Sequence, residues 1–252
     1  MQVAIVTGAS SGIGQSAALR IAERGTGVIL TYRSGPERAL ETVRIIEKEG
    51  GMAVALPLDL SRTETFPAFR EAVVAALRDT WQRHDFDFLV NNAGLAEAAP
   101  FEDTTEEMFD RLAQALLKGP YFLTQTLLPL LADGGAVVNT SSNSALPHIT
   151  EPGYSVYATM KGGMIVLTRY LAKELSPRGI RVNAIAPGST RTRLSDNAFE
   201  RFPEVVPALA ARTALGRVGE PDDVGAVIAT LLSDDSRWIT AQTIEVSGGF
   251  DL

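Results

Sequence analysis

A tyrosine and a lysine stand four positions apart, at Tyr157 and Lys161, in a stretch that the sequence predicts to be helical. Residues four apart lie on one face of a helix, so the phenol and the ammonium group would be neighbours. A free tyrosine has a pKa near 10 and exchanges protons poorly at neutral pH. A cation about 4 Å away, at an effective dielectric constant of about 20, contributes roughly 4 kcal/mol, or about three pKa units. The pair therefore predicts a tyrosine of lowered pKa that exchanges a proton with a carbonyl oxygen.

A serine follows the strand that precedes this helix. Residues 136–139 predict a buried strand, and Thr140, Ser141 and Ser142 come directly after it. The carboxyl ends of parallel strands meet at one edge of a sheet, where ligands bind. We therefore expect Ser142 to hold the substrate oxygen beside Tyr157.

A glycine-rich turn lies between the first predicted strand and the first predicted helix. It reads Thr7-Gly8-Ala9-Ser10-Ser11-Gly12-Ile13-Gly14. Glycines allow the backbone to approach a pyrophosphate closely, and the helix N-terminus supplies free N–H groups and a positive dipole. We favour a dinucleotide site. The same residues also fit the G-x-S-x-G turn of serine hydrolases, but that reading needs a partner histidine, and His84 and His148 are both poorly placed.

The end of the second predicted strand bears on the choice of cofactor. NAD sites usually carry an acidic residue there, which binds the ribose hydroxyls. Here the segment is Tyr32-Arg33-Ser34, without an acid. A guanidinium can bind a ribose 2′-phosphate, which a carboxylate would repel. The sequence favours NADP(H), with NAD(H) and a merely solvated Arg33 as alternatives. Asp59, at the end of the third strand, is a candidate contact for the adenine end.

Short β-branched runs alternate with amphipathic stretches along the chain. Strands are expected at residues 3–7, 28–32, 53–58, 88–90, 136–139, 181–185 and 242–246. Helices are expected at residues 12–25, 36–48, 63–81, 105–131, 221–232 and around Tyr157 to about residue 176. This alternation predicts a three-layer α/β domain with a parallel sheet, spanning residues 1–252 as one unit. Residues 188–212 are the least regular stretch and are predicted to form a substrate lid.

Composition excludes several classes of function. The chain has no cysteine and two histidines, so a thiolate or histidine metal site is not expected. A net charge of −7 argues against nucleic-acid binding. No segment has the length of a membrane span, and no signal peptide is evident. We expect a cytoplasmic protein with a small-molecule substrate.

Taken together, these motifs resemble the short-chain dehydrogenase/reductase family over essentially the whole chain. The matching segments are Thr7-Gly8-(x)3-Gly12-Ile13-Gly14, Asn91-Asn92-Ala93-Gly94, Ser142 with Tyr157-(x)3-Lys161, Pro187-Gly188-(x)3-Thr192, Gly216-Arg217-(x)-Gly219-(x)-Pro221 and Ser247-Gly248-Gly249. Among its members the chain is similar to 3-oxoacyl-carrier-protein reductases.

The resemblance implies a Rossmann-like doubly wound sheet of seven strands and a homo-oligomer, either a tetramer or a dimer. It implies hydride transfer between NADP(H) and a carbonyl or alcohol, either free or linked to an acyl carrier. Tyr157 would be the general acid/base, Lys161 would hold the nicotinamide ribose, and Ser142 would orient the substrate. The implied cofactor contacts are Gly8, Ser10, Ser11, Gly12, Ile13, Gly14, Tyr32, Arg33, Ser34, Asp59, Leu60, Asn91, Ala93, Gly94, Pro187, Gly188 and Thr192.

Two positions depart from the family pattern. Leu116 stands where the family usually has an asparagine that holds a relay water, so either the relay runs differently or turnover is weakened. A cofactor-binding protein with weakened catalysis is therefore the alternative function. The interval between the serine and Tyr157 is also about two residues longer than usual. Counting back from Tyr157 selects Ser144, but we favour Ser142 because a strand end fixes geometry better than a loop.

Overall fold

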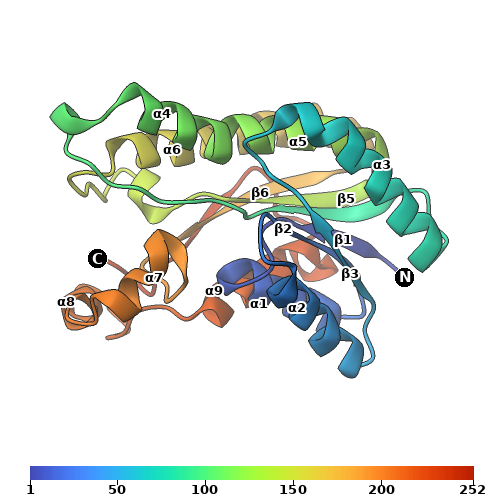
Figure 1. Ribbon diagram of the computed structural model, residues 1–252, viewed down its shortest axis with the longest axis horizontal. Helices are drawn as coiled ribbons and strands as arrows, with labels where there is room; N and C mark the ends of the chain where they lie inside the picture. Colours follow the sequence, from blue (N-terminus) through green and yellow to red (C-terminus); the bar gives the residue numbers. More distant parts are fainter.

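The computed structural model describes residues 1–252, apart from the side chains of Ser195, Asp196 and Ala198. Within this part of the chain, one seven-stranded sheet runs through the middle of the molecule (Figure 1). Its strands are β1 (Val3–Val6), β2 (Gly27–Tyr32), β3 (Ala53–Pro57), β4 (Phe86–Asn91), β5 (Leu131–Thr140), β6 (Arg181–Pro187) and β7 (Thr243–Val246). The order across the sheet is β3-β2-β1-β4-β5-β6-β7, and all neighbours are parallel. The predicted seven-stranded, doubly wound parallel sheet is confirmed.

Strand β1 shows why these runs form a central sheet. Its four residues are all fully buried, with Ala4 and Val6 packing into one apolar core. Val3 and Ile5 pack into a second core on the opposite face. Side chains alternate between the faces of a strand, so an uninterrupted apolar run is stable only when both faces are covered.

Helices cover both faces of the sheet (Figure 1). One layer holds α1 (Gly12–Glu23), α2 (Pro36–Lys48) and α9 (Pro221–Leu232). The other holds α3 (Phe66–Ala76), α4 (Glu106–Ala113), α5 (Gly119–Leu127) and α6 (Ser155–Glu174). Two short helices, α7 (Leu194–Arg201) and α8 (Val205–Ala211), lie near the C-terminus. None of the helices described is long and apolar enough to span a bilayer.

Prolines interrupt two helices that the sequence predicts to be continuous. The stretch 105–131 is α4, a π-helical turn at Gln114–Lys118, then α5. Pro120 has no N–H for the helical ladder, so the regular pattern restarts there. Leu131 is not helical but begins β5, after a short 3-10 turn that contains Pro129. Likewise, residues 63–81 divide into a 3-10 turn, α3 with Pro67 in its first turn, and a π-helical turn at Leu77–Trp81.

The segment 188–212 is not the irregular loop that the sequence predicts, because it contains α7 and α8. Phe199 on α7, Phe202 after it, and Val205 and Leu209 on α8 line the same cavity. Val205 and Leu209 are four residues apart, so they lie on one face of α8.

Candidate active site

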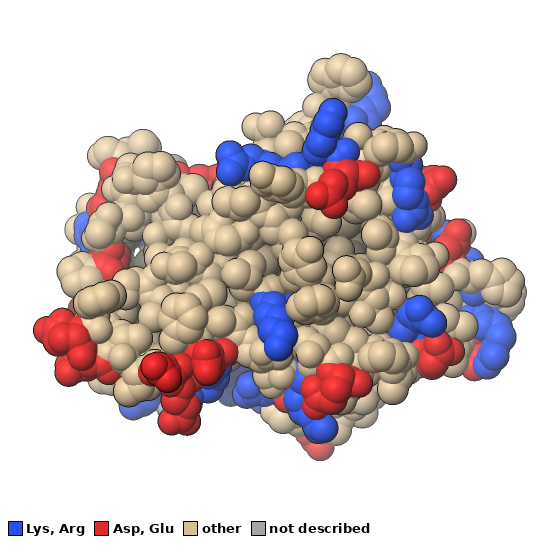
Figure 2. Space-filling model, turned by 90° about the horizontal axis from the view of Figure 1, so that it is seen from above, with Lys and Arg blue, Asp and Glu red and all other residues tan. Residues whose placement is uncertain are grey.

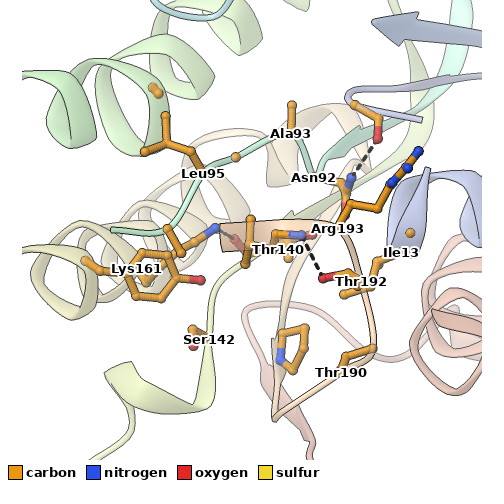
Figure 3. A pocket seen from close by; sticks show the side chains of 18 of the residues that line it. Ile13, Asn92, Ala93, Leu95, Thr140, Ser142, Lys161, Thr190, Thr192 and Arg193 are labelled. Carbon is orange, nitrogen blue, oxygen red and sulfur yellow. Dashed lines mark hydrogen bonds between the residues drawn. The ribbon is translucent and has the colours of Figure 1, made fainter. Parts of the chain in front are cut away.

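A cavity of about 890 Å³ opens at the carboxyl edge of the sheet, where the loops after β1, β4, β5 and β6 meet (Figure 3). The strand order reverses between β1 and β4, the position at which doubly wound sheets bind ligands. Of the predicted site residues, the cavity wall contains Gly8, Ser10, Ser11, Gly12, Ile13, Arg33, Ser34, Asp59, Leu60, Ala93, Gly94, Ser142, Tyr157, Lys161, Pro187, Gly188 and Thr192. Three predicted contacts, Gly14, Tyr32 and Asn91, lie behind this wall.

The glycine turn forms a close backbone cradle. Gly8 and Gly12 have φ angles of +65° and +59°, in the left-handed region that side chains disfavour. A Cβ on Gly8 would lie 2.8 Å from the Cα of Ala93. A Cβ on Gly14 would lie 2.4 Å from the carbonyl oxygen of Gly8. Gly14 therefore packs the helix onto the turn, and the cradle before the N-terminus of α1 fits a pyrophosphate.

Thr7 ties this cradle to the turn after β4. Its hydroxyl accepts hydrogen bonds from the backbone N–H groups of Asn92 at 2.9 Å and Ala93 at 3.0 Å. The Asn92 amide in turn donates to the Thr7 carbonyl at 3.0 Å. These bonds hold Asn92, Ala93 and Gly94 at the cavity wall. Asn92 belongs to the predicted Asn91–Gly94 motif but was not among the predicted cofactor contacts.

Asn91 does not contact the cavity through its side chain. The side chain is buried, and its amide donates to Thr124 at 3.0 Å and to Asn139 at 2.9 Å. Asn139 continues the network by donating to Thr168 at 2.9 Å. The prediction that Asn91 contacts the cofactor is thus corrected: its side chain joins β4 to β5 and α5. Strand alternation explains it, because Asn91 and Asn92 point to opposite faces.

Two guanidinium groups flank the far end of the cavity. Arg33 and Arg38 both line it and are exposed, and neither forms an ion pair with a described carboxylate. Arg38, in the first turn of α2, was missed by the sequence prediction, although a second basic residue five positions after Arg33 was a usable signal. The prediction that Tyr32 contacts the cofactor is corrected, because its side chain packs against the apolar core.

Asp59 lies at the same end, near Arg33. Burial opposes ionisation of this carboxylate, but two hydrogen bonds from Ser61 outweigh it. Together with the charge of Arg33, they hold the pKa of Asp59 below its ordinary value. Asp59 is therefore a charged acceptor at the predicted adenine end.

Tyr157 and Lys161 lie one turn apart on α6 and both reach the cavity. The Nζ atom of Lys161 is 5.8 Å from the centroid of the Tyr157 ring. The same atom donates to the carbonyl oxygen of Thr140 at 2.7 Å, which fixes the lysine across the edge of the sheet (Figure 3). Ser142 interacts with the phenol of Tyr157 in the sense that lowers the pKa of the phenol. Ser144 lines the cavity too, but it bonds Ser142 rather than Tyr157.

The predicted lowering of the Tyr157 pKa is wrong for the protein without ligand. Burial raises the pKa of Tyr157 to about 12, and the hydrogen bond with Ser142 only partly opposes this. Burial also lowers the pKa of Lys161 to about 8. The sequence argument considered attraction between the pair and omitted the cost of removing both groups from water.

Leu116 is 1% exposed and lies in an apolar cluster with Met108, Leu112, Val156 and Met160. A Cβ on Gly94 would be 3.1 Å from Leu116 Cδ2 and 3.8 Å from the Nζ atom of Lys161. A leucine side chain therefore fills the space beside the lysine.

The other end of the cavity is apolar and aromatic. Its wall includes Leu95, Ile149, Tyr154, Phe199, Phe202, Val205, Leu209 and Phe250. Arg212 also lines it, but this guanidinium pairs with Glu151 and Asp251 and lies 4.4 Å from the centroid of the Phe250 ring. The site thus joins a polar, dinucleotide-sized half to an apolar half, with Tyr157 between them.

A family model described as enoyl-(acyl carrier protein) reductase matches residues 8–251. The chain belongs to the short-chain dehydrogenase/reductase family. It is 38% identical over 248 residues to an uncharacterized oxidoreductase of Methylorubrum extorquens, covering 98% of this chain and 97% of that protein.

Solved structures of this short-chain dehydrogenase/reductase fold superpose closely. The reductase LugOII, which catalyses keto-reduction at C1 during lugdunomycin biosynthesis, has a TM-score of 0.94 and 36% identity, covering 100% of this chain and 98% of its own. The angucycline C-6 ketoreductase LanV with bound NADP has a TM-score of 0.92 and 35% identity, covering 99% and 95%. The chain is accordingly an oxidoreductase of the dehydrogenase/reductase class that acts on CH–OH or carbonyl groups.

Proposed function

We propose that this protein reduces a bulky, apolar, ring-containing ketone, with NADPH as the hydride donor. One observation carries the proposal: a single cavity has a cradle and two arginines at one end, aromatic side chains at the other, and Tyr157 between them. NADPH would supply the hydride. Tyr157 donates its proton to the ketone oxygen, Ser142 orients that oxygen, and Lys161 supplies positive charge beside the phenol. The keto-reduction at C1 in lugdunomycin biosynthesis by LugOII and the angucycline C-6 ketoreductase activity of LanV support this substrate class.

A carrier-linked 3-oxoacyl substrate has less support from the residues around the cavity. The family model's description mentions an acyl carrier protein, and arginines of residues 188–212 could meet an acidic carrier. However, Arg191 pairs with Glu220 at 3.1 Å, and Arg212 pairs with Glu151 and Asp251. Ion pairs within the chain reduce the charge that these two residues offer to an acidic partner.

We also propose that the protein is a homo-oligomer. The helical face made by α4, α5 and α6 exposes Phe109, Tyr121, Phe122, Val166 and Tyr170. Figure 2 looks onto this side of the molecule and shows a broad area with few charged side chains. An apolar, charge-poor face favours association with a second copy. The mass in solution, measured by light scattering, decides between monomer, dimer and tetramer.

Titration with NADPH and NADH, followed by nicotinamide fluorescence, tests the cofactor proposal. We expect NADPH to bind at least tenfold more tightly, a difference of about 1.4 kcal/mol. Replacing Arg33 by alanine removes a charge-assisted bond and should weaken NADPH binding about tenfold or more, while NADH binding stays unchanged. Arg44→Ala is the control, because Arg44 lies on α2 and pairs with Glu41. Equal binding of both nucleotides would show that Arg33 and Arg38 are surface charges, and absence of binding would contradict the proposed function.

The rate of ketone reduction should depend on pH through Lys161. Reduction needs the phenol of Tyr157 protonated and the lysine charged. With pKa values of about 12 and about 8, Lys161 is the first of the two to lose its proton as the pH rises. The kcat/KM for NADPH, which reports groups of the free enzyme, should be level below about pH 7 and fall about tenfold per unit above pH 8. A profile that stays level to pH 10 would contradict this assignment.

A further inference from the structure

Two serine hydroxyls form a hydrogen-bonded chain that ends at Tyr157. The Oγ atom of Ser142 accepts from the Oγ of Ser144 at 2.9 Å and from its backbone N–H at 3.3 Å. A hydroxyl oxygen has two acceptor positions and one hydrogen. The same hydroxyl interacts with the phenol of Tyr157. A hydroxyl can both donate and accept, so Ser142 can pass a proton between its two neighbours.

The outer end of this chain reaches the cavity. Ser142 is 8% exposed, whereas Ser144 is only partly buried, and both line the cavity wall. Ser144 is thus the more solvent-accessible of the two serines. The short turn Asn143–Ala145 carries Ser144.

Lys161 is the polar neighbour of Tyr157 on α6. Lys161 is buried, and its Nζ donates to the carbonyl oxygen of Thr140 at 2.7 Å. Next to it stands Leu116, whose Cδ2 lies 3.1 Å from the position a Cβ would take on Gly94. A leucine side chain can neither donate nor accept a proton.

We propose that Tyr157 regains its proton through Ser142 and Ser144, and this inference rests on the proposed ketone reduction. When the hydride reaches the ketone carbon, the Tyr157 O–H bond breaks and its proton goes to the substrate oxygen. The phenolate then takes the proton of Ser142, Ser142 takes that of Ser144, and Ser144 takes one from water in the cavity. Each hydroxyl loses one O–H bond and gains another, so the protein ends each turnover unchanged.

Single-turnover and steady-state kinetics separate this role from simple positioning of the substrate. The probe is 2-tetralone, a fused-ring ketone, with NADPH oxidation followed by absorbance. With enzyme in excess over NADPH, each Tyr157 donates only the proton it already carries. The Ser144→Ala enzyme should then match the natural enzyme within twofold. In the steady state the proton must be replaced each time, so its kcat should fall at least tenfold.

Two further variants complete the test. Ser144→Thr keeps a hydroxyl and should restore most of the kcat. Ser155→Ala removes an exposed serine at the start of α6 and should leave both rates unchanged. NADPH affinity and thermal unfolding of Ser144→Ala should match the natural protein, because Ser144 has no part in the cofactor cradle.

Either of two outcomes overturns the relay. An unchanged kcat in Ser144→Ala shows that protons reach Tyr157 by another path. A parallel fall of the single-turnover rate shows that Ser144 orients Ser142 without carrying protons. Failure of the natural enzyme to oxidise NADPH with any ring ketone would instead contradict the proposed function, and the relay with it.

Discussion

The Tyr157→Phe enzyme should reduce ketones 10²- to 10⁴-fold more slowly than the natural enzyme, the usual contribution of a positioned general acid. Phenylalanine keeps the ring that packs against the apolar cluster around Leu116 and Met160. It removes the only atom of residue 157 that can give a proton to the substrate oxygen. The measurement is steady-state NADPH oxidation with 2-tetralone, together with NADPH affinity by fluorescence. The affinity should change by less than threefold, because the fold of the site is preserved.

Tyr170→Phe is the matched control for this change. Tyr170 lies on the same helix, α6, but is 64% exposed and points away from the cavity. The control should leave kcat and NADPH affinity unaltered. Turnover by Tyr157→Phe at the natural rate would remove Tyr157 from the mechanism, while loss of NADPH binding would mean that the substitution had disturbed the site.

The Leu116→Asn variant is expected to lose about 3–5 kcal/mol in free energy of unfolding. Leu116 is buried among Met108, Leu112, Val156 and Met160, so the change removes apolar contacts and encloses an amide. Urea unfolding measures the loss. Leu116→Met conserves volume and should cost less than about 1.5 kcal/mol.

The same variant tests the alternative of a cofactor-binding protein with weakened catalysis. If Leu116 had impaired an asparagine-based relay, restoring the asparagine should raise kcat many-fold in the folded fraction. We expect no such rise, because Ser144 supplies the proton path in our proposal. A large rise would favour the weakened-catalysis hypothesis and would argue against the serine relay.

The sequence predicted the architecture well because the strands are buried on both faces. Runs such as Val3–Val6 leave little ambiguity, and the following glycine turn can only sit at the carboxyl edge. That edge also brings Ser142 and Tyr157 to one cavity from different strands and helices. Local patterns were sufficient here, since topology alone gathers these loops.

The sequence did not predict which way individual side chains point or how far they are removed from water. Spacing does not tell which of Asn91 and Asn92 faces the cavity, because a one-residue change reverses the face of a strand. The spacing also predicted that Tyr157 lies beside the charge of Lys161, but it did not show that burial desolvates both groups. The turn at Gln114–Lys118 and the start of β5 at Leu131 were missed because the apolar periodicity continues through them.

The cradle, the turn after β4 and the loops after β5 and β6 come from segments far apart in the chain, and they meet only when the sheet is complete. A dinucleotide that bridges them binds the native state and not the unfolded chain. At a hundred times its dissociation constant, such a ligand would stabilise the domain by about 2.7 kcal/mol. The resistance of the protein to heat and to proteases then depends on the concentration of the nucleotide as well as on the amino-acid sequence. A cell depleted of the nucleotide would lose this contribution to the protein's stability along with its reducing power.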